Sequence, residues 1–162
     1  VLQQVRSLGT SDFVFLTGDI FDAPSHLIPF DPVDGCFKHF PSRHGIAFTT
    51  GNHEHINHVA DEVVDDLKRI GVRTLENDCF FVKELGVNLA GTTDLHATRF
   101  DPLRGPDVAL AFSKCRKGFP VLFLAHQPNM EPMVSTYIKT QNIREDTVIF
   151  SGHTHAGQGW LF

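Results

Sequence analysis

The stretch Ser151-Gly152-His153-Thr154-His155-Ala156-Gly157-Gln158 decides how the rest of this chain is interpreted. It follows the apolar run Val148-Ile149-Phe150 and presents two histidines two residues apart among small residues. The apolar run predicts a buried strand, and a doubly wound sheet places its chemistry at the carboxyl ends of its strands. We therefore expect both imidazoles to reach a functional site at that edge of a sheet.

Three earlier apolar runs also end in side chains that can bind metal. Residues 13–16 lead into Thr17-Gly18-Asp19-Ile20-Phe21-Asp22, and residues 46–50 lead into Gly51-Asn52-His53-Glu54-His55. Residues 121–125 end at His126-Gln127-Pro128. Oxygen and nitrogen donors without a thiolate match a hard or borderline ion such as Mn²⁺, Fe²⁺ or Zn²⁺. The neutral amide of an asparagine also leaves the ion its positive charge, which suits an anionic substrate.

The remaining pattern alternates strands and helices, as in an α/β domain. Helices are expected at 1–8, 59–70, 107–117 and 130–140, and strands at 13–16, 46–50, 72–75, 79–82, 87–90, 121–125 and 148–150. Residues 23–44 contain four prolines and no clean period, so they are expected to form a loop.

Length and composition indicate one globular domain over residues 1–162, with 41% hydrophobic and 20% charged residues. The net charge is -5 and no run of Lys or Arg exceeds two residues, so a nucleic-acid partner is not expected. No apolar run reaches the roughly 18 residues that cross a bilayer. Cys36, Cys79 and Cys115 are odd in number and widely spaced, and we expect them to be reduced.

The motifs as an ordered set resemble the calcineurin-like metallophosphoesterase superfamily. The matching segments are Gly18-Asp19-Ile20-Phe21-Asp22, Gly51-Asn52-His53-Glu54, His126-Gln127-Pro128 and Gly152-His153-Thr154-His155. Shorter segments such as Thr74-Leu75-Glu76-Asn77 resemble one branch of the superfamily. That branch includes bacterial membrane-associated phosphodiesterases and the transmembrane protein with a metallophosphoesterase domain. The resemblance implies a four-layer αββα sandwich of two mixed β-sheets flanked by helices.

The resemblance also implies roles for single residues. Asp19 would bridge two divalent metal ions (Mn, Fe or Zn), Asn52, His126 and His153 would complete one metal site, and His155 would bind the other ion. His53 would lie beside the substrate phosphate with its ring oriented by Glu54, and Asp22 would act in the outer shell. The expected reaction is attack on a phosphoester by a hydroxide held between the metals, in a phosphodiesterase or a phosphomonoesterase.

His55, Asp94 and His96 are candidate substrate-binding residues, although solvated histidines and a plain loop explain them as well. The substrate would be a small phosphoester or a lipid-linked phosphate. The sequence does not predict an oligomeric state.

The chain departs from the superfamily in one respect. The first motif, an Asp-x-His at the end of the first strand, is missing, because no residue before Asp12 could supply it. We therefore interpret the chain as a fragment truncated at its amino terminus, and at its carboxyl terminus as well. Such a fragment is expected to bind one metal ion well and to hydrolyse phosphoesters poorly. A membrane anchor of the parent protein would lie in the missing amino-terminal region.

Two other functions remain open at this point. The first is a non-catalytic metal-binding or interaction module on the same fold. The second is a metallohydrolase that cleaves C–N or C–O bonds with similar ligands. Each motif by itself is also consistent with a structural role. The aspartates could form turns, and His126 could be a hydrogen-bonded histidine of the core.

Overall fold

The computed structural model describes residues 9–21, 37 and 40–155, and their strands form two sheets. The first sheet consists of the parallel strands β1 (Val14–Leu16), β2 (Ile46–Phe48) and β3 (Arg73–Thr74). The second consists of β4 (Asp78–Val82), β5 (Val87–Gly91), β6 (Val121–Leu124) and β7 (Thr147–Phe150). Strand β4 runs antiparallel to β5, whereas β5, β6 and β7 are parallel, so the second sheet is mixed.

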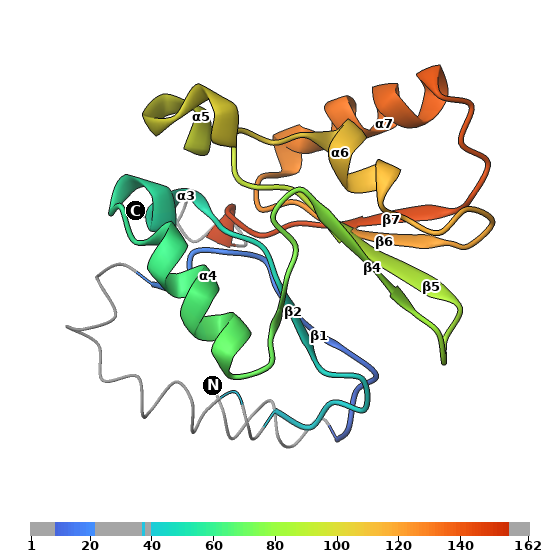
Figure 1. Ribbon diagram of the computed structural model, residues 1–162, viewed down its shortest axis with the longest axis horizontal. Coiled ribbons are helices and arrows are strands. Elements are labelled where there is room, and N and C mark those ends of the chain that lie inside the picture. Colours follow the sequence, from blue (N-terminus) through green and yellow to red (C-terminus); the bar gives the residue numbers. More distant parts are fainter. Residues whose placement is uncertain (1–8, 22–36, 38–39, 156–162) are drawn as a thin grey trace.

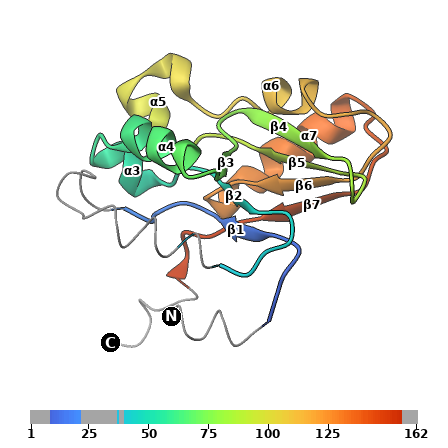
Figure 2. The same ribbon diagram turned by 60° about the horizontal axis from the view of Figure 1, so that its bottom comes forward.

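Helices lie on the outer sides of the two sheets (Figures 1 and 2). Beside the first sheet lie α3 (Asn52–Ile56) and α4 (Ala60–Arg69). After β5 come α5 (Ala97–Phe100), the 3₁₀ turn η2 (Pro102–Arg104) and α6 (Val108–Ser113). After β6 come the 3₁₀ turn η3 (Pro128–Met130) and α7 (Glu131–Thr140).

Three hydrophobic clusters separate the layers. One lies between the sheets and contains Ala47, Leu89 and Leu124, with Phe15 and Phe150 packed against it. A second joins the first sheet to α4 and a third joins the second sheet to α6 and α7. Two sheets with helices outside each give the four-layer arrangement that the sequence predicted.

Most of the predicted elements are confirmed, with shifts at their ends. The helix expected at 59–70 is α4, but the helix expected at 107–117 ends at Ser113. Asn52–Ile56 follows the strand expected at 46–50 and forms the short helix α3, which was not predicted. The predicted helix 1–8, Asp22 and residues 156–158 lie outside the described residues.

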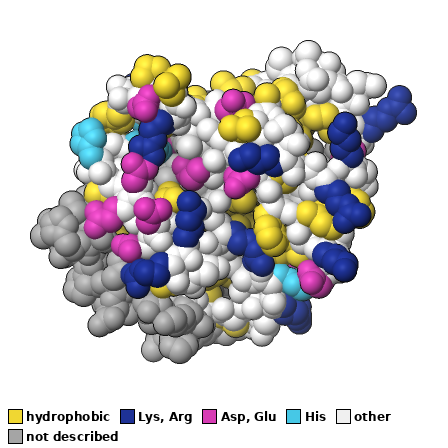
Figure 3. Space-filling model, in the orientation of Figure 1, with side chains coloured by type: hydrophobic (Ala, Val, Ile, Leu, Met, Phe, Trp, Pro, Cys, Tyr) yellow, Lys and Arg dark blue, Asp and Glu magenta, His cyan; other side chains and the backbone are white. Residues whose placement is uncertain are grey.

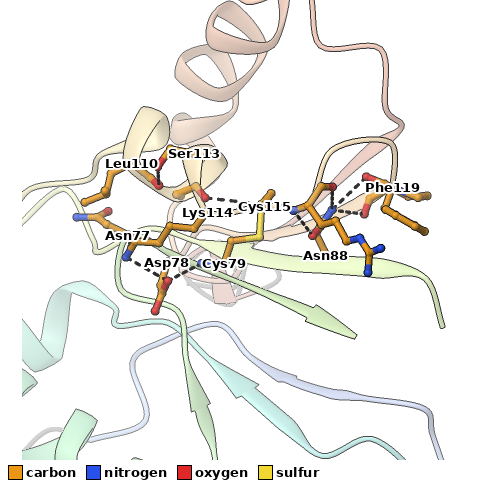
Figure 4. The surroundings of a disulfide bond; sticks show 12 residues. Asn77, Asp78, Cys79, Asn88, Leu110, Ser113, Lys114, Cys115 and Phe119 are labelled. Atoms are coloured by element: carbon orange, nitrogen blue, oxygen red, sulfur yellow. Dashed lines mark hydrogen bonds and ion pairs between the residues drawn. A yellow bond between two sulfur atoms is a disulfide. The ribbon is translucent and has the colours of Figure 1, made fainter. Parts of the chain in front are cut away.

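The cysteine prediction was wrong, because Cys79 and Cys115 form a disulfide (Figure 4). Cys79 lies on β4 and Cys115 lies just after α6, with their Cα atoms 5.3 Å apart. The two residues are 36 positions apart in the sequence and become neighbours only because α6 packs beside β4. Cys36 lies outside the described residues.

The face seen in Figure 3 carries charges of both signs, and acidic side chains gather over α4. Asp61 of that helix forms a two-contact ion pair with Arg104, and Asp66 contacts Arg69 at 3.3 Å. Among the helices described, none is long and apolar enough to span a membrane.

Candidate metal centre

The polar ends of four strands meet at one edge of the fold. Asp19 follows β1, Asn52 follows β2, His126 follows β6 and His153 follows β7. Figure 1 shows the chain leaving β7, in red, close to the segment that follows β1, in blue. The parallel direction of these strands brings their carboxyl ends to the same side.

The ring atom Nε2 of His126 is the centre of the arrangement. It lies 3.0 Å from Oδ2 of Asp19, 3.0 Å from Oδ1 of Asn52 and 3.1 Å from Nδ1 of His153. In the described part of the chain, Asp19, His126 and His153 form the group of ligand-type side chains close enough to share an ion, with their donor atoms within 4.8 Å of one another. The His126 side chain is buried, whereas His153 is exposed.

The other ring nitrogen of His126 determines its tautomer. Nδ1 lies 2.5 Å from the carbonyl oxygen of Thr17. A carbonyl oxygen only accepts, so Nδ1 carries a proton, and Nε2 is the nitrogen left to bind a metal ion. A backbone carbonyl that orients an imidazole in this way is a common partner of metal-binding histidines.

Atoms of Asp19, Asn52 and His153 that can each act as an acceptor face Nε2 of His126. Such atoms repel one another unless a cation or protons lie between them. A divalent cation with borderline character satisfies two imidazoles, a carboxylate and an amide oxygen together. The residues therefore fit a metal ion.

Two glycines allow the backbone to pack this closely. A Cβ on Gly18, which has a φ of 90°, would lie 2.5 Å from the backbone nitrogen of Gly51 and 2.7 Å from Nδ1 of His126. A Cβ on Gly51 would lie 2.5 Å from the backbone nitrogen of Asp19. Any larger residue at either position would push the ligand-bearing segments apart.

Glu54 is fully buried and has partners other than those expected. Its Oε1 accepts hydrogen bonds from the backbone N–H groups of Ile20 (2.6 Å) and Phe21 (3.1 Å), and its Oε2 accepts them from Asp19 (3.0 Å) and Gly51 (2.8 Å). The carboxylate therefore holds two ligand loops together. Its expected role in orienting the ring of His53 stays a prediction.

His53 and His155 lie beside the centre. The backbone N–H of His53 donates to Oδ1 of Asp19 at 2.9 Å, and its side chain is partly exposed. His155 is exposed and lines the same open pocket as Asp19, His126 and His153. It is not part of the close group around His126.

The three candidate substrate-binding residues lie in a neighbouring polar cluster. Buried Asp94 accepts hydrogen bonds from Nε2 of Gln127 at 3.0 Å on both oxygens and lies 3.3 Å from Nδ1 of His96. His55 is 3.0 Å from the hydroxyl of Thr50, and burial lowers the pKa of its ring. The segment Asp94-Leu95-His96 has the spacing of the missing Asp-x-His motif. However, the side chain of Asp94 contacts Gln127 and not Asp19.

Sequence reasoning missed Glu76, Thr17 and Gln127. Glu76 holds Thr50 next to the centre and Thr17 fixes the tautomer of His126. Glu76 could have been found from the sequence, because it is a polar residue shortly after a strand, as the predicted ligands are. Thr17 acts through its carbonyl group, which no side-chain pattern reveals.

A family model described as calcineurin-like phosphoesterase matches residues 1–157 of this chain. The chain belongs to that family. Its members use divalent metal ions, which agrees with the donor set around His126. No solved structure matches the chain.

Several curated proteins are similar to the chain. An uncharacterized metallophosphoesterase of Helicobacter pylori (strain 26695) is 29% identical over 93% of this chain and 38% of its own length. The transmembrane protein with metallophosphoesterase domain of Danio rerio is 32% identical over 91% of this chain and 33% of its own length. A putative metallophosphoesterase of Caenorhabditis elegans is 33% identical over 73% of this chain and 25% of its own length. The chain thus spans between a quarter and about two fifths of these relatives.

The resemblance to this superfamily, and to the branch with the transmembrane protein, is confirmed by these matches. The individual site residues remain predictions.

Proposed function

We propose that this chain provides metal ligands for the hydrolysis of a phosphoester. The observation that carries the proposal is the convergence of Asp19, Asn52 and His153 on Nε2 of His126. Membership of the calcineurin-like phosphoesterase family supports the same reaction class.

Asp19, Asn52, His126 and His153 would hold one divalent ion, and His155 with Asp19 would contact a second. When bound, such ions act as Lewis acids that acidify water and neutralise charge on a phosphoryl group. The chain itself fixes the ligands, because Thr17 orients His126 and Glu54 holds the loop that carries Asp19.

His53 is the proposed proton donor to the leaving oxygen. It follows the ligand Asn52 directly, and its backbone is fixed on Asp19 while its side chain keeps some exposure. A histidine has the pKa range needed to donate a proton near neutral pH. Asp22, proposed for the outer shell, lies outside the described residues.

The proposed substrate is a phosphomonoester or phosphodiester, either small or lipid-linked. Within the polar cluster beside the centre, His96 keeps 21% of its side chain exposed while Asp94 is buried. We infer that His96 contacts substrate and that Asp94, together with Gln127, orients the His96 ring. His55 would contribute only by shaping this region.

A second candidate function is a module that binds one ion without hydrolysis. It is favoured by the close group in the described residues, which supplies ligands for a single ion around His126. His155, the ligand expected for a second ion, is not a member of that group.

Calorimetric titration with Mn²⁺ tests the metal site. We expect one ion to bind well, and the variant His126→Ala to weaken binding by more than about tenfold. His58→Asn is the matched control, because His58 packs against Phe100 and has a φ of 57° that asparagine tolerates. Absence of binding in the wild type would refute the proposal, and two tight ions would refute the one-ion expectation.

A hydrolysis assay separates the two candidate functions. The wild-type chain and His126→Ala are compared with bis(4-nitrophenyl) phosphate and with a nitroanilide amide in the presence of Mn²⁺. Hydrolysis of the phosphodiester by the wild type, lost in His126→Ala, supports the enzyme. A wild-type chain that binds Mn²⁺ but cleaves neither substrate supports the binding module, and cleavage of the amide alone supports a metallohydrolase of another class.

A further inference from the structure

Glu76 lies where the pairing of two strands ends. The parallel ladder between β2 and β3 ends at the pair Phe48 and Thr74, and Leu75 donates the last backbone hydrogen bond to Phe48 at 2.8 Å. Beyond this hydrogen bond, the Glu76 side chain takes the place of the backbone groups that would otherwise pair with the segment after β2. Its Oε1 accepts the backbone N–H of Thr50 at 2.9 Å, and its Oε2 accepts the Thr50 hydroxyl at 2.9 Å.

Thr50 is the first residue of the segment 50–53, which we call the metal loop. This loop contains Gly51, the ligand Asn52 and His53. A second carboxylate, that of Glu54, accepts the N–H of Gly51 at 2.8 Å. Two adjacent backbone N–H groups of the loop are therefore held by two different carboxylates.

We propose that Glu76 is a positioning residue that places Asn52 for metal binding by holding Thr50. Among its described partners, Glu76 contacts neither His126 nor the three ligands around it, so it acts through Thr50. The inference rests on the proposed function only in taking Asn52 as a metal ligand.

A chain of hydrogen bonds extends from Glu76 to His55. The Thr50 hydroxyl, which donates to Glu76, also lies 3.0 Å from Nε2 of His55. The hydroxyl has a single proton, so it accepts from His55 whenever it donates to an ionised Glu76. When Glu76 is protonated, one of its oxygens becomes a donor, so only one of the two Thr50 donors still has an acceptor. The hydrogen bonds from Glu76 through Thr50 to His55 then run in the opposite direction.

The surroundings of Glu76 make its charge sensitive to pH near neutrality. Burial raises the pKa of the carboxyl to about 7, with a smaller rise from Glu54, while the Thr50 hydrogen bonds and Arg104 oppose the rise. Glu76 also lines a pocket of about 340 Å³ that gives protons access to it. The charged or titratable groups of that pocket are His55 from α3, Asp61, Asp65 and Lys68 from α4, and Arg104 from η2.

Mn²⁺ affinity is the direct test, because the effect concerns the position of a ligand. The whole chain is titrated about one pH unit above and below the pKa of Glu76, as wild type, Glu76→Gln and the control Glu84→Gln. Glu84 is exposed in the turn between β4 and β5, far along the chain from the metal loop. The neutral glutamine side chain of the Glu76→Gln variant mimics protonated Glu76 at every pH.

At the higher pH we expect Glu76→Gln to bind Mn²⁺ about tenfold more weakly than wild type, as loss of one charge-assisted hydrogen bond implies. At the lower pH the two affinities should converge, since wild-type Glu76 is then largely protonated. The control Glu84→Gln should match the wild type at both pH values. All variants are compared at the same pH, so effects of pH that do not involve Glu76 cancel.

Variants of Thr50 provide an independent test that leaves the charge of Glu76 unchanged. Thr50→Val removes the hydroxyl and should weaken Mn²⁺ binding at the higher pH, whereas Thr50→Ser should restore it. Amide hydrogen exchange within residues 50–53 should be faster in Glu76→Gln and Thr50→Val than in the wild type.

Two results separate the possible failures. Equal Mn²⁺ affinity of wild type and Glu76→Gln at the higher pH, with the Thr50 variants also unchanged, overturns the positioning role. Failure of the wild type to bind Mn²⁺ overturns the proposed function instead. Circular dichroism and urea unfolding show whether each variant is folded, and an unfolded Glu76→Gln leaves the Thr50 pair to decide.

Discussion

The ring of Phe15 packs against the ring of Phe150, with 4.9 Å between their centroids. Phe15 belongs to β1 of the first sheet, and Phe150 is the last residue of β7 in the second. Asp19 lies four residues after Phe15 and His153 lies three residues after Phe150. This contact between the sheets therefore sets how closely the two ligand-bearing segments approach.

Replacing Phe150 by alanine should weaken both the fold and the metal site. We expect a loss of about 2 kcal/mol in the free energy of unfolding, below the range for a fully buried Phe because both rings are partly exposed. The Mn²⁺ affinity should fall by several-fold, and Phe150→Leu should recover most of it. If Phe150→Ala lost stability with unchanged Mn²⁺ affinity, the contact would hold the sheets without setting the ligands.

Reduction of the Cys79–Cys115 disulfide should destabilise the domain. The bond closes a loop over a separation of 36 residues, and opening it restores chain entropy worth about 4 kcal/mol to the unfolded state in a simple polymer estimate. Urea unfolding with and without a reducing agent measures the difference. The double variant Cys79→Ala/Cys115→Ala is the control, since the reductant should not change its stability.

Thiol counting provides the complementary check of the same bond. Unfolded protein prepared without reductant should expose one reactive thiol, that of Cys36, out of three cysteines. Three reactive thiols would contradict the disulfide. Because such bonds persist in oxidising compartments, the thiol state in the native cell would also indicate the environment of the domain.

Replacing Glu54 by glutamine should be more damaging than its small change in shape suggests. The Glu54 carboxylate accepts four backbone hydrogen bonds, and the amide of glutamine has only one accepting oxygen. Two amides would face an NH₂ group, so we expect a loss of about 3 kcal/mol in stability. Glu84→Gln, on an exposed turn, is the matched control and should be neutral. A near-neutral Glu54→Gln would show that the loops close without the carboxylate.

The fold and the approach of Asp19, His126 and His153 to one another could be predicted because they depend on local patterns. Apolar runs mark the strands, and the carboxyl ends of parallel strands lie at one edge. Asp19, His126 and His153 therefore come together as soon as the strands are paired correctly. Their spacing in the sequence is unrelated to the distances of 3.0 Å and 3.1 Å that separate their donor atoms in space.

The remaining features depend on contacts that no local pattern contains. The disulfide forms between a strand and the end of a helix, and its partners carry no signal in sequence. Glu54 binds the backbone of Ile20, 34 positions away, and Glu76 binds Thr50, 26 positions away. The short helix α3 begins just after the expected strand 46–50, where no helix was predicted, and Glu54 closes its first turn by accepting the N–H of Gly51.

The titration of Glu76 should make the domain less stable as the pH rises toward neutrality. Burial raises the pKa of this carboxyl from its ordinary value of 4.5 to about 7, so the folded chain binds the proton more tightly than the unfolded chain. The resulting stabilisation is complete below pH 4.5 and is lost as the pH rises through about 7. The total is about 3 kcal/mol for a shift of this size.

Glu76→Gln removes this dependence, so its unfolding free energy, measured in urea from acidic to neutral pH, should fall less steeply than that of the wild type. The variant should then be the more stable protein at neutral pH while binding Mn²⁺ more weakly, which a residue kept only for stability would not show. Parallel pH curves for the two proteins would contradict a raised pKa at Glu76.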